Sequence, residues 1–98
     1  TTREISIDYI QKVICEYFNI PVESIHSKTR KREIVQARQL SMYFSKKHTK
    51  SSLAIIGQQC GKKDHATVLH ACRTVNNLVE TDKQFRLFVE ELDKRIKF

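Results

Sequence analysis

The chain contains only two Gly and one Pro among its 98 residues. Folds of the all-β class need many tight turns, which depend on glycine at positive φ and on proline, so this class is disfavoured. A glycine-rich phosphate-binding loop is disfavoured for the same reason. A chain of this length has room for one hydrophobic core. We therefore expect a single all-α domain over residues 1–98, in which residues 1–6 are a residual linker.

Apolar side chains recur at intervals of three and four residues along most of the chain, which is the helical spacing. The pattern predicts about six helices, over residues 7–18, 22–27, 30–47, 53–60, 64–79 and 85–97. Ser6, Ser51 or Ser52, and Asp64 are expected to be N-caps, because their side-chain oxygens can accept hydrogen bonds from free backbone N–H groups. The segment that begins at Asp64 follows the pattern most regularly.

Positive charge is concentrated in the middle of the chain. Residues 24–73 contain eleven Lys or Arg and two acidic residues, whereas the remaining residues carry a net charge of −2. Such segregation creates a directional field, and a phosphate backbone is the commonest partner of a basic stripe. The alternative is an ordinary solvated surface. No apolar run approaches the roughly 20 residues that a membrane-spanning helix needs.

Residues 52–80 have the pattern of a helix-turn-helix, with a short helix, a glycine-containing turn and a longer amphipathic recognition helix. The apolar stripe of the second helix comprises Val68, Ala71, Cys72 and Val75. Its opposite side then carries Ala66, His70, Arg73 and Asn77. The second helix of such a motif can enter the major groove of DNA with its first turn against the base edges.

Asp64 stands at the start of that second helix. A carboxylate close to DNA is repelled by phosphates unless it accepts a hydrogen bond from a specific donor, such as cytosine N4. It would therefore contribute specificity at some cost in affinity. The alternative is a plain helix cap without a DNA contact. The neighbouring His65 can donate to a base acceptor or pack against a thymine methyl group, or it is simply an exposed histidine.

Several segments resemble one known family. The run GKKDHATVLHACR at residues 61–73 is similar to the signature of the C-terminal DNA-binding domain of the bacterial replication initiators of the DnaA family. The segments SKTRKR at 27–32, ARQLSM at 37–42 and SLAIIG at 52–57 resemble the same domain in the same order. The resemblance covers about residues 7–78. It implies an all-α, monomeric domain that binds double-stranded boxes of the replication origin.

The resemblance also implies roles for individual residues. The base contacts would be Lys63, Asp64, His65 and Ala66 in the major groove and Arg38 in the neighbouring minor groove. The expected phosphate contacts are Lys28, Arg30, Lys50, Ser52, Thr67 and His70. Spacing alone would instead make Arg38 one more charge on an exposed helix face. The chain departs from the family where Lys62 and Lys63 replace glycine and arginine and where Ala66 replaces threonine, so base preference there is open.

Partners and location follow from the same resemblance. Double-stranded DNA is the expected partner, together with regulatory proteins and the ATPase module that precedes this domain in the family. ATP would bind only in that module, so no cofactor is expected in these residues. The absent initiator Met indicates an excised piece of a longer protein. The expected location is the bacterial cytoplasm, at the nucleoid, and contact of the first helix with a membrane is not expected.

Other functions fit the sequence less well than DNA binding. The sequence has no nucleophile with an adjacent base, so no catalytic residue is expected. Cys60, His65, His70 and Cys72 do not have the spacing of a zinc site, so no metal is expected. These cysteines and Cys15 are expected to be free thiols in a reducing compartment. The remaining alternatives are a helical protein-interaction module with a basic surface, which docks through its first amphipathic helix, and a helix-turn-helix transcription regulator.

Overall fold

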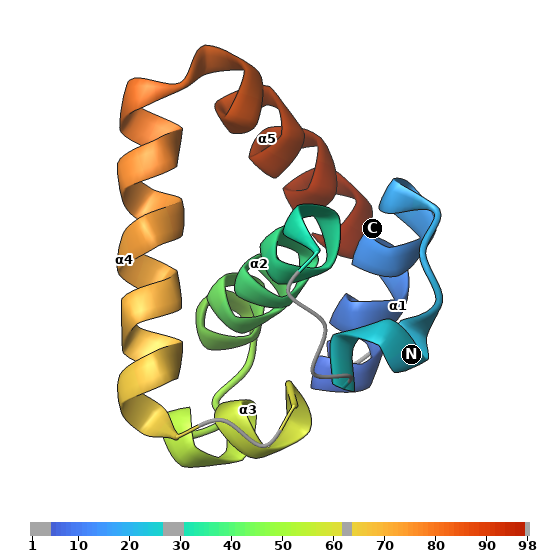
Figure 1. Ribbon diagram of the computed structural model, residues 1–98, viewed down its shortest axis with the longest axis vertical. Helices are drawn as coiled ribbons and strands as arrows, with labels where there is room; N and C mark the ends of the chain where they lie inside the picture. Colours follow the sequence, from blue (N-terminus) through green and yellow to red (C-terminus); the bar gives the residue numbers. More distant parts are fainter. Residues whose placement is uncertain (1–4, 27–30, 62–63, 98) are drawn as a thin grey trace.

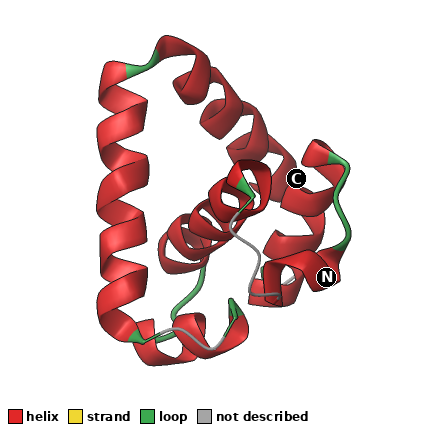
Figure 2. Cartoon of the chain, viewed as in Figure 1, coloured by secondary structure: helices red, strands yellow, loops and turns green. Residues whose placement is uncertain are grey.

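The computed structural model describes residues 5–26, 31–61 and 64–97, and these residues form helices without any strand (Figure 2). The elements in chain order are α1 (Ile7–Phe18), the 3-10 helix η1 (Val22–His26), α2 (Arg32–His48), α3 (Leu53–Gln59), α4 (His65–Thr81) and α5 (Lys83–Lys97). The all-α prediction is confirmed. Five α-helices and one 3-10 helix correspond to the six predicted segments.

Local hydrogen bonds explain where the helices begin. Ser6 Oγ accepts from the backbone N–H of Tyr9, and Ser52 Oγ accepts from that of Ile55. Both therefore act as N-caps, which leaves Ser51 outside that role. The last helix begins earlier than its apolar residues predicted, because Asp82 Oδ1 accepts from the backbone N–H groups of Gln84 and Phe85. Only Asp82 separates α4 from α5.

The helices enclose two groups of buried apolar side chains. The scaffold core joins α1, α2, α4 and α5 and consists of Ile10, Ile14, Ala37, Leu40, Phe44, Val75, Phe85, Val89, Leu92 and Ile96. The helix-turn-helix core joins α3 and the first half of α4 to α1 and α2, and it consists of Ile7, Met42, Ile56, Cys60, Val68 and Ala71. Figure 1 shows α2 in the middle of the fold, with α4 along one side and α3 at the end where α4 begins.

Candidate nucleic-acid interface

The first turn of α4 projects from the end of the molecule that also carries α3 (Figure 1). Asp64, His65, Ala66 and Thr67 are all exposed. Further along α4, Val68, Ala71 and Val75 are buried, whereas His70, Arg73 and Asn77 are exposed. Cys72, the remaining residue of the predicted apolar stripe, is half-buried, and the predicted division of this helix into a buried and an exposed side is otherwise confirmed. The tip that was expected to read bases is therefore accessible to a partner.

Asp64 is the N-cap of α4. Its Oδ1 accepts hydrogen bonds from the Thr67 backbone N–H at 2.9 Å and from the Thr67 hydroxyl at 2.7 Å. The bonds from the Thr67 hydroxyl and then from its N–H hold the pKa of Asp64 below its usual value, because they stabilise the charged form. A carboxylate offers about four acceptor positions, and the cap uses two. Capping and base contact are thus compatible in Asp64.

The Thr67 hydroxyl is already used inside the protein. Since a hydroxyl has one proton to donate, its bond to Asp64 occupies the donor that a phosphate contact would need. A contact between this hydroxyl and a phosphate would require the hydroxyl to leave Asp64.

Three other expected phosphate contacts, His70, Lys50 and Ser52, are exposed, and the Ser52 oxygen also caps α3. The expected contacts Lys28, Arg30 and Lys63 lie outside the described residues.

Arg38 is buried, with 9% of its surface exposed. Its Nε donates to the Ile25 carbonyl oxygen at 2.9 Å, which ties α2 to the end of η1. Gly61, which follows α3, lies beside this bond. A Cβ added to this glycine would be 3.7 Å from Arg38 Nε and 3.2 Å from the Ile25 oxygen. The alternative that Arg38 is an ordinary exposed charge is wrong. Helical spacing missed its burial because η1 and the turn, rather than α2 itself, cover the side chain.

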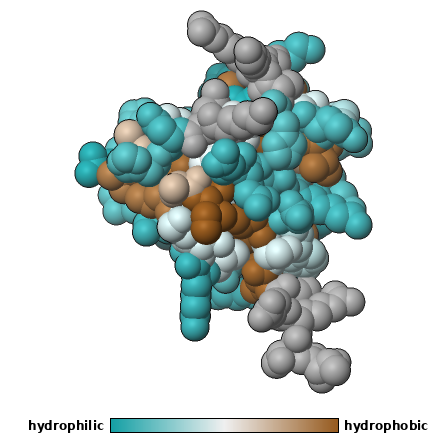
Figure 3. Space-filling model, turned by 90° about the horizontal axis from the view of Figure 1, so that it is seen from below, coloured by the Kyte–Doolittle hydropathy of each residue, from teal (hydrophilic) through white to brown (hydrophobic). Residues whose placement is uncertain are grey.

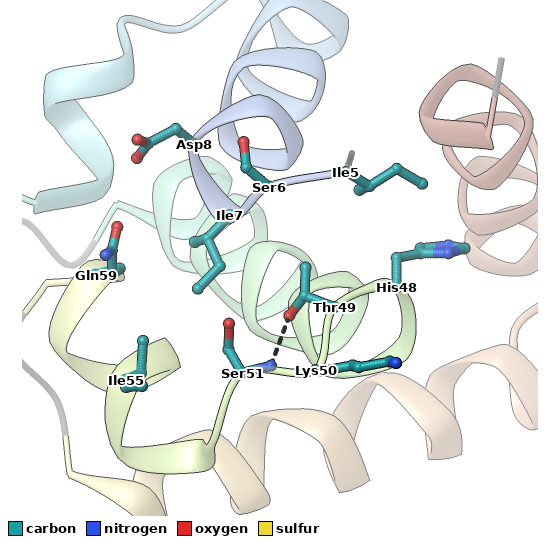
Figure 4. A pocket seen from close by; sticks show the side chains of 10 residues that line it. All are labelled: Ile5, Ser6, Ile7, Asp8, His48, Thr49, Lys50, Ser51, Ile55 and Gln59. Carbon is teal, nitrogen blue, oxygen red and sulfur yellow. Dashed lines mark hydrogen bonds between the residues drawn. The ribbon is translucent and has the colours of Figure 1, made fainter. Parts of the chain in front are cut away.

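The loop between α2 and α3 borders an open groove of about 740 Å³. Figure 4 shows Lys50 and Ser51 of this loop opposite Ile7 at the start of α1, with Ile55 of α3 on the same rim. The backbone N–H of Ser51 donates to Thr49 Oγ1 at 3.3 Å, which fixes the path of the loop. The loop therefore presents Lys50 and Ser52 next to α3.

The end of the molecule seen in Figure 3 is mainly hydrophilic around a smaller hydrophobic area. Ile55 on α3 is 50% exposed, so apolar surface is present on this helix.

The three cysteines are free, as predicted, and burial raises the pKa of Cys60 to about 11. Among the described residues, no group of three or more His, Cys, Asp or Glu could hold a metal ion.

Gln11 is a buried polar side chain that is not among the predicted site residues. Only 1% of its surface is exposed, and its Nε2 donates to the Gln59 carbonyl oxygen at 2.8 Å and to Cys60 Sγ at 3.4 Å. A pattern that could have identified it is present, because Gln11 occupies an i+4 position in the stripe formed by Ile7, Ile10 and Ile14. A polar residue at such a position is buried and therefore needs a hydrogen-bond partner.

Comparison with known proteins decides the family. The model of the bacterial dnaA protein helix-turn-helix family matches residues 7–75. The chain belongs to this family. It is 63% identical over 94 residues to the chromosomal replication initiator protein DnaA of Flavobacterium psychrophilum, and 49% identical over 96 residues to that of Bacteroides thetaiotaomicron. These alignments cover 96% and 98% of this chain, but each covers 20% of the relative.

The DnaA protein of a Wolbachia strain from Brugia malayi is 46% identical over 95 residues, which are 97% of this chain and 21% of that protein. The chain thus spans about a fifth of the length of its relatives. It corresponds to the helix-turn-helix DNA-binding domain of DnaA, so the predicted family and non-catalytic class are confirmed. No helix formed by the described residues of this DnaA domain is long and apolar enough to cross a membrane.

Proposed function

We propose that this DnaA domain binds boxes of the replication origin with sequence preference and thereby positions the initiator on double-stranded DNA. The observation that carries the proposal is the exposed first turn of α4, which begins with the carboxyl group of Asp64. An anion is unfavourable next to phosphates, so this residue fits readout of a base donor better than general affinity for DNA. His65 and Ala66 complete the exposed turn, and Lys63 precedes it in the sequence.

Arg38 is proposed to enter the neighbouring minor groove. Its place beside Gly61 puts it next to the turn that precedes α4, so major- and minor-groove contacts would arise from adjoining parts of the fold. Because Arg38 is buried and its Nε bonds to the Ile25 oxygen, a base contact would require the side chain to turn outward when the domain meets DNA. A narrow, electronegative A·T-rich groove is the preferred environment of such an arginine.

Phosphate contacts are proposed for Lys50, Ser52 and His70, which are exposed, for Lys28 and Arg30, and for Thr67 once its hydroxyl has left Asp64. These contacts would set the position of the domain on the duplex without reading sequence. A domain that neutralises about six phosphates should show a log–log salt slope of about −5. Affinity for a cognate box should exceed that for a scrambled duplex by at least about 10³-fold.

The rest of the initiator is proposed to carry the nucleotide chemistry. The relatives are about five times as long as this chain, and the ATPase module expected from the family would bind ATP outside these residues. That module and regulatory proteins are the proposed protein partners. The proposed location is the bacterial cytoplasm, at the nucleoid.

A protein-interaction module is the second candidate function. Its proposed docking element was the apolar stripe of the first helix, but Ile10 and Ile14 of α1 are fully buried in the scaffold core. The stripe is therefore already used for folding. Equal, weak binding to cognate and scrambled duplexes would nevertheless favour an acidic protein partner, and the salt titration distinguishes the two functions.

The decisive experiment is selection of binding sites from random duplexes with the wild-type domain, Asp64→Ala and Asp64→Ser. Serine keeps an N-cap oxygen but removes the carboxylate, so it separates capping from base contact. We expect both variants to lose preference at one or two positions while they retain much of their salt-sensitive nonspecific binding. Full preference in Asp64→Ser would show that the carboxylate reads no base.

A further inference from the structure

Two buried polar side chains reach the α3–α4 turn from inside the domain. Gln11 of α1 bonds to Gln59 and Cys60 at the end of α3, and Arg38 of α2 lies beside Gly61. Of the other buried polar side chains in the described residues, Ser41 bonds within its own helix. Gln11 of α1 therefore bonds to the start of the turn, and Arg38 of α2, whose Nε bonds to Ile25, packs beside it.

The bond from Gln11 completes the end of α3. The last four carbonyl groups of any helix lack partners within that helix, and Gln59 supplies the last carbonyl of α3. The helix has only seven residues, so its stability comes from contacts with the rest of the fold. By donating to the Gln59 oxygen at 2.8 Å, Gln11 stabilises the point at which the chain leaves α3.

The direction of the chain after Gln59 determines where α4 begins. Cys60 is fully buried in the helix-turn-helix core together with Val68 and Ala71 of α4, so the end of α3 packs directly against the first half of α4. Asp64 follows within a few residues. The position of the α4 tip relative to Arg38 therefore depends on the bond that Gln11 makes.

We propose that Gln11 is a positioning residue for base readout. It touches no DNA itself, and it sets the geometry between the first turn of α4 and Arg38 through the Gln59 carbonyl. This inference rests on the proposed function, because it concerns specificity for a DNA box. Loss of the bond would impair discrimination between boxes more than general attraction to DNA, since the exposed charges of the domain stay in place.

The test compares Gln11→Met with the wild-type domain. Methionine has a similar length but cannot donate to the Gln59 oxygen. Gln84→Met is the matched control, because it makes the same replacement at an exposed position on α5. Gln11→Asn keeps the amide, but its side chain is one methylene shorter and does not reach the Gln59 oxygen. This variant replaces Gln11→Met in the test if Gln11→Met does not fold. Two quantities are measured in each variant below its unfolding temperature.

The first quantity is amide hydrogen exchange in the free domain, and the second is the ratio of affinities for the duplex recovered by selection and for a scrambled duplex. We expect faster exchange at the Gln59 and Cys60 amides in the Gln11 variants. We also expect the affinity ratio to fall about threefold to tenfold, the effect of one net hydrogen bond, while scrambled-duplex affinity is unchanged. Gln84→Met should alter neither quantity.

Unchanged exchange at these amides would overturn the proposal without reference to DNA. Faster exchange with an unchanged affinity ratio would show that the bond is structural and does not determine specificity. A wild-type domain that fails to discriminate between the duplexes would refute the proposed function itself, and the inference with it. Because the wild type is measured first, that failure is distinguished from failure of the Gln11 inference.

Discussion

The scaffold core and the helix-turn-helix core differ in how they are held together. Among the described residues, the scaffold core contains ten buried apolar side chains, whereas the helix-turn-helix core contains six. Beside the smaller core, Gln11 of α1 bonds to the end of α3, and Arg38 of α2 bonds to Ile25 of η1. Apolar burial is nondirectional, whereas hydrogen bonds require particular geometry. The comparison indicates that the scaffold supplies stability and that the polar bonds orient the recognition surface.

The largest effect is expected from a scaffold substitution. Leu92→Ala removes a fully buried side chain of α5 and should lower the free energy of unfolding by about 2–5 kcal/mol, through lost burial and a residual cavity. Leu87→Ala is the matched control on the same helix. Leu87 is 64% exposed, so its replacement should change stability by less than about 0.5 kcal/mol. Urea unfolding of both variants measures the difference.

The same pair tests whether stability and recognition are separable. At a temperature where Leu92→Ala is still folded, its affinity ratio for cognate and scrambled duplexes should equal that of the wild type. A lower ratio in the folded variant would contradict the division between scaffold and recognition surface.

The next effect concerns Arg38. Arg38→Ala should weaken binding to a cognate box by about 1–3 kcal/mol, the range for one specific base contact. Arg73→Ala, on the exposed side of α4, is the control and should weaken cognate and scrambled binding alike. Fluorescence anisotropy at fixed salt gives both affinities, and thermal unfolding confirms that each variant is folded. Unchanged cognate affinity of Arg38→Ala would refute the proposed minor-groove contact.

The smallest effect concerns the ion-pair cluster that joins the end of α2 to α5. Asp93 Oδ1 lies 2.7 Å from His48 Nε2 and 3.4 Å from Lys47 Nζ, and its Oδ2 lies 3.1 Å from Lys97 Nζ. Desolvation raises the pKa of Asp93, but the bonds from His48 and Lys97 and the charge of Lys47 together lower it below the usual value. The folded protein therefore binds the proton more weakly than the unfolded chain.

Asp93 consequently adds stability above the pKa of an unfolded aspartate, about 3.9, and loses it as the pH falls through the lower pKa of the folded state. Asp93→Asn should remove this part of the acid dependence and flatten the fall in stability below that pH. The free energy of unfolding as a function of pH measures it, with Glu90→Gln, an exposed acid of the same helix, as control. An identical acid dependence in Asp93→Asn and the wild type would contradict the assignment.

The helix boundaries and caps were largely predictable because they depend on neighbours in the sequence. Ser6, Ser52 and Asp64 each bond to an N–H three residues ahead, and such bonds follow from residue type and position. The exposed side of α4 was predictable for a related reason, since Val68, Ala71 and Val75 mark the buried side by spacing.

The burial of Arg38 and the role of Gln11 were not predictable in this way. Gln11 bonds to a carbonyl 48 residues away, and Arg38 bonds to one 13 residues away on a different helix. Asp93 likewise contacts His48 of α2, which lies 45 residues away in the sequence. Each partner is a backbone or side-chain group whose position depends on how whole helices pack, so residue type alone carries no information about it.

The amino-acid sequence by itself determined the helical class, the order of the helices, their caps and the side of α4 that faces outward, because these features arise from hydrogen bonds and apolar periodicity within a few residues. The tertiary structure alone decided which groups the buried polar side chains bond to. Packing brought Gln11 and Arg38 to the α3–α4 turn from two other helices. Their bonds exist only after the helices have assembled. Packing brings donor and acceptor together and removes the water that would otherwise bond to them, so a buried polar group without a partner would be destabilising.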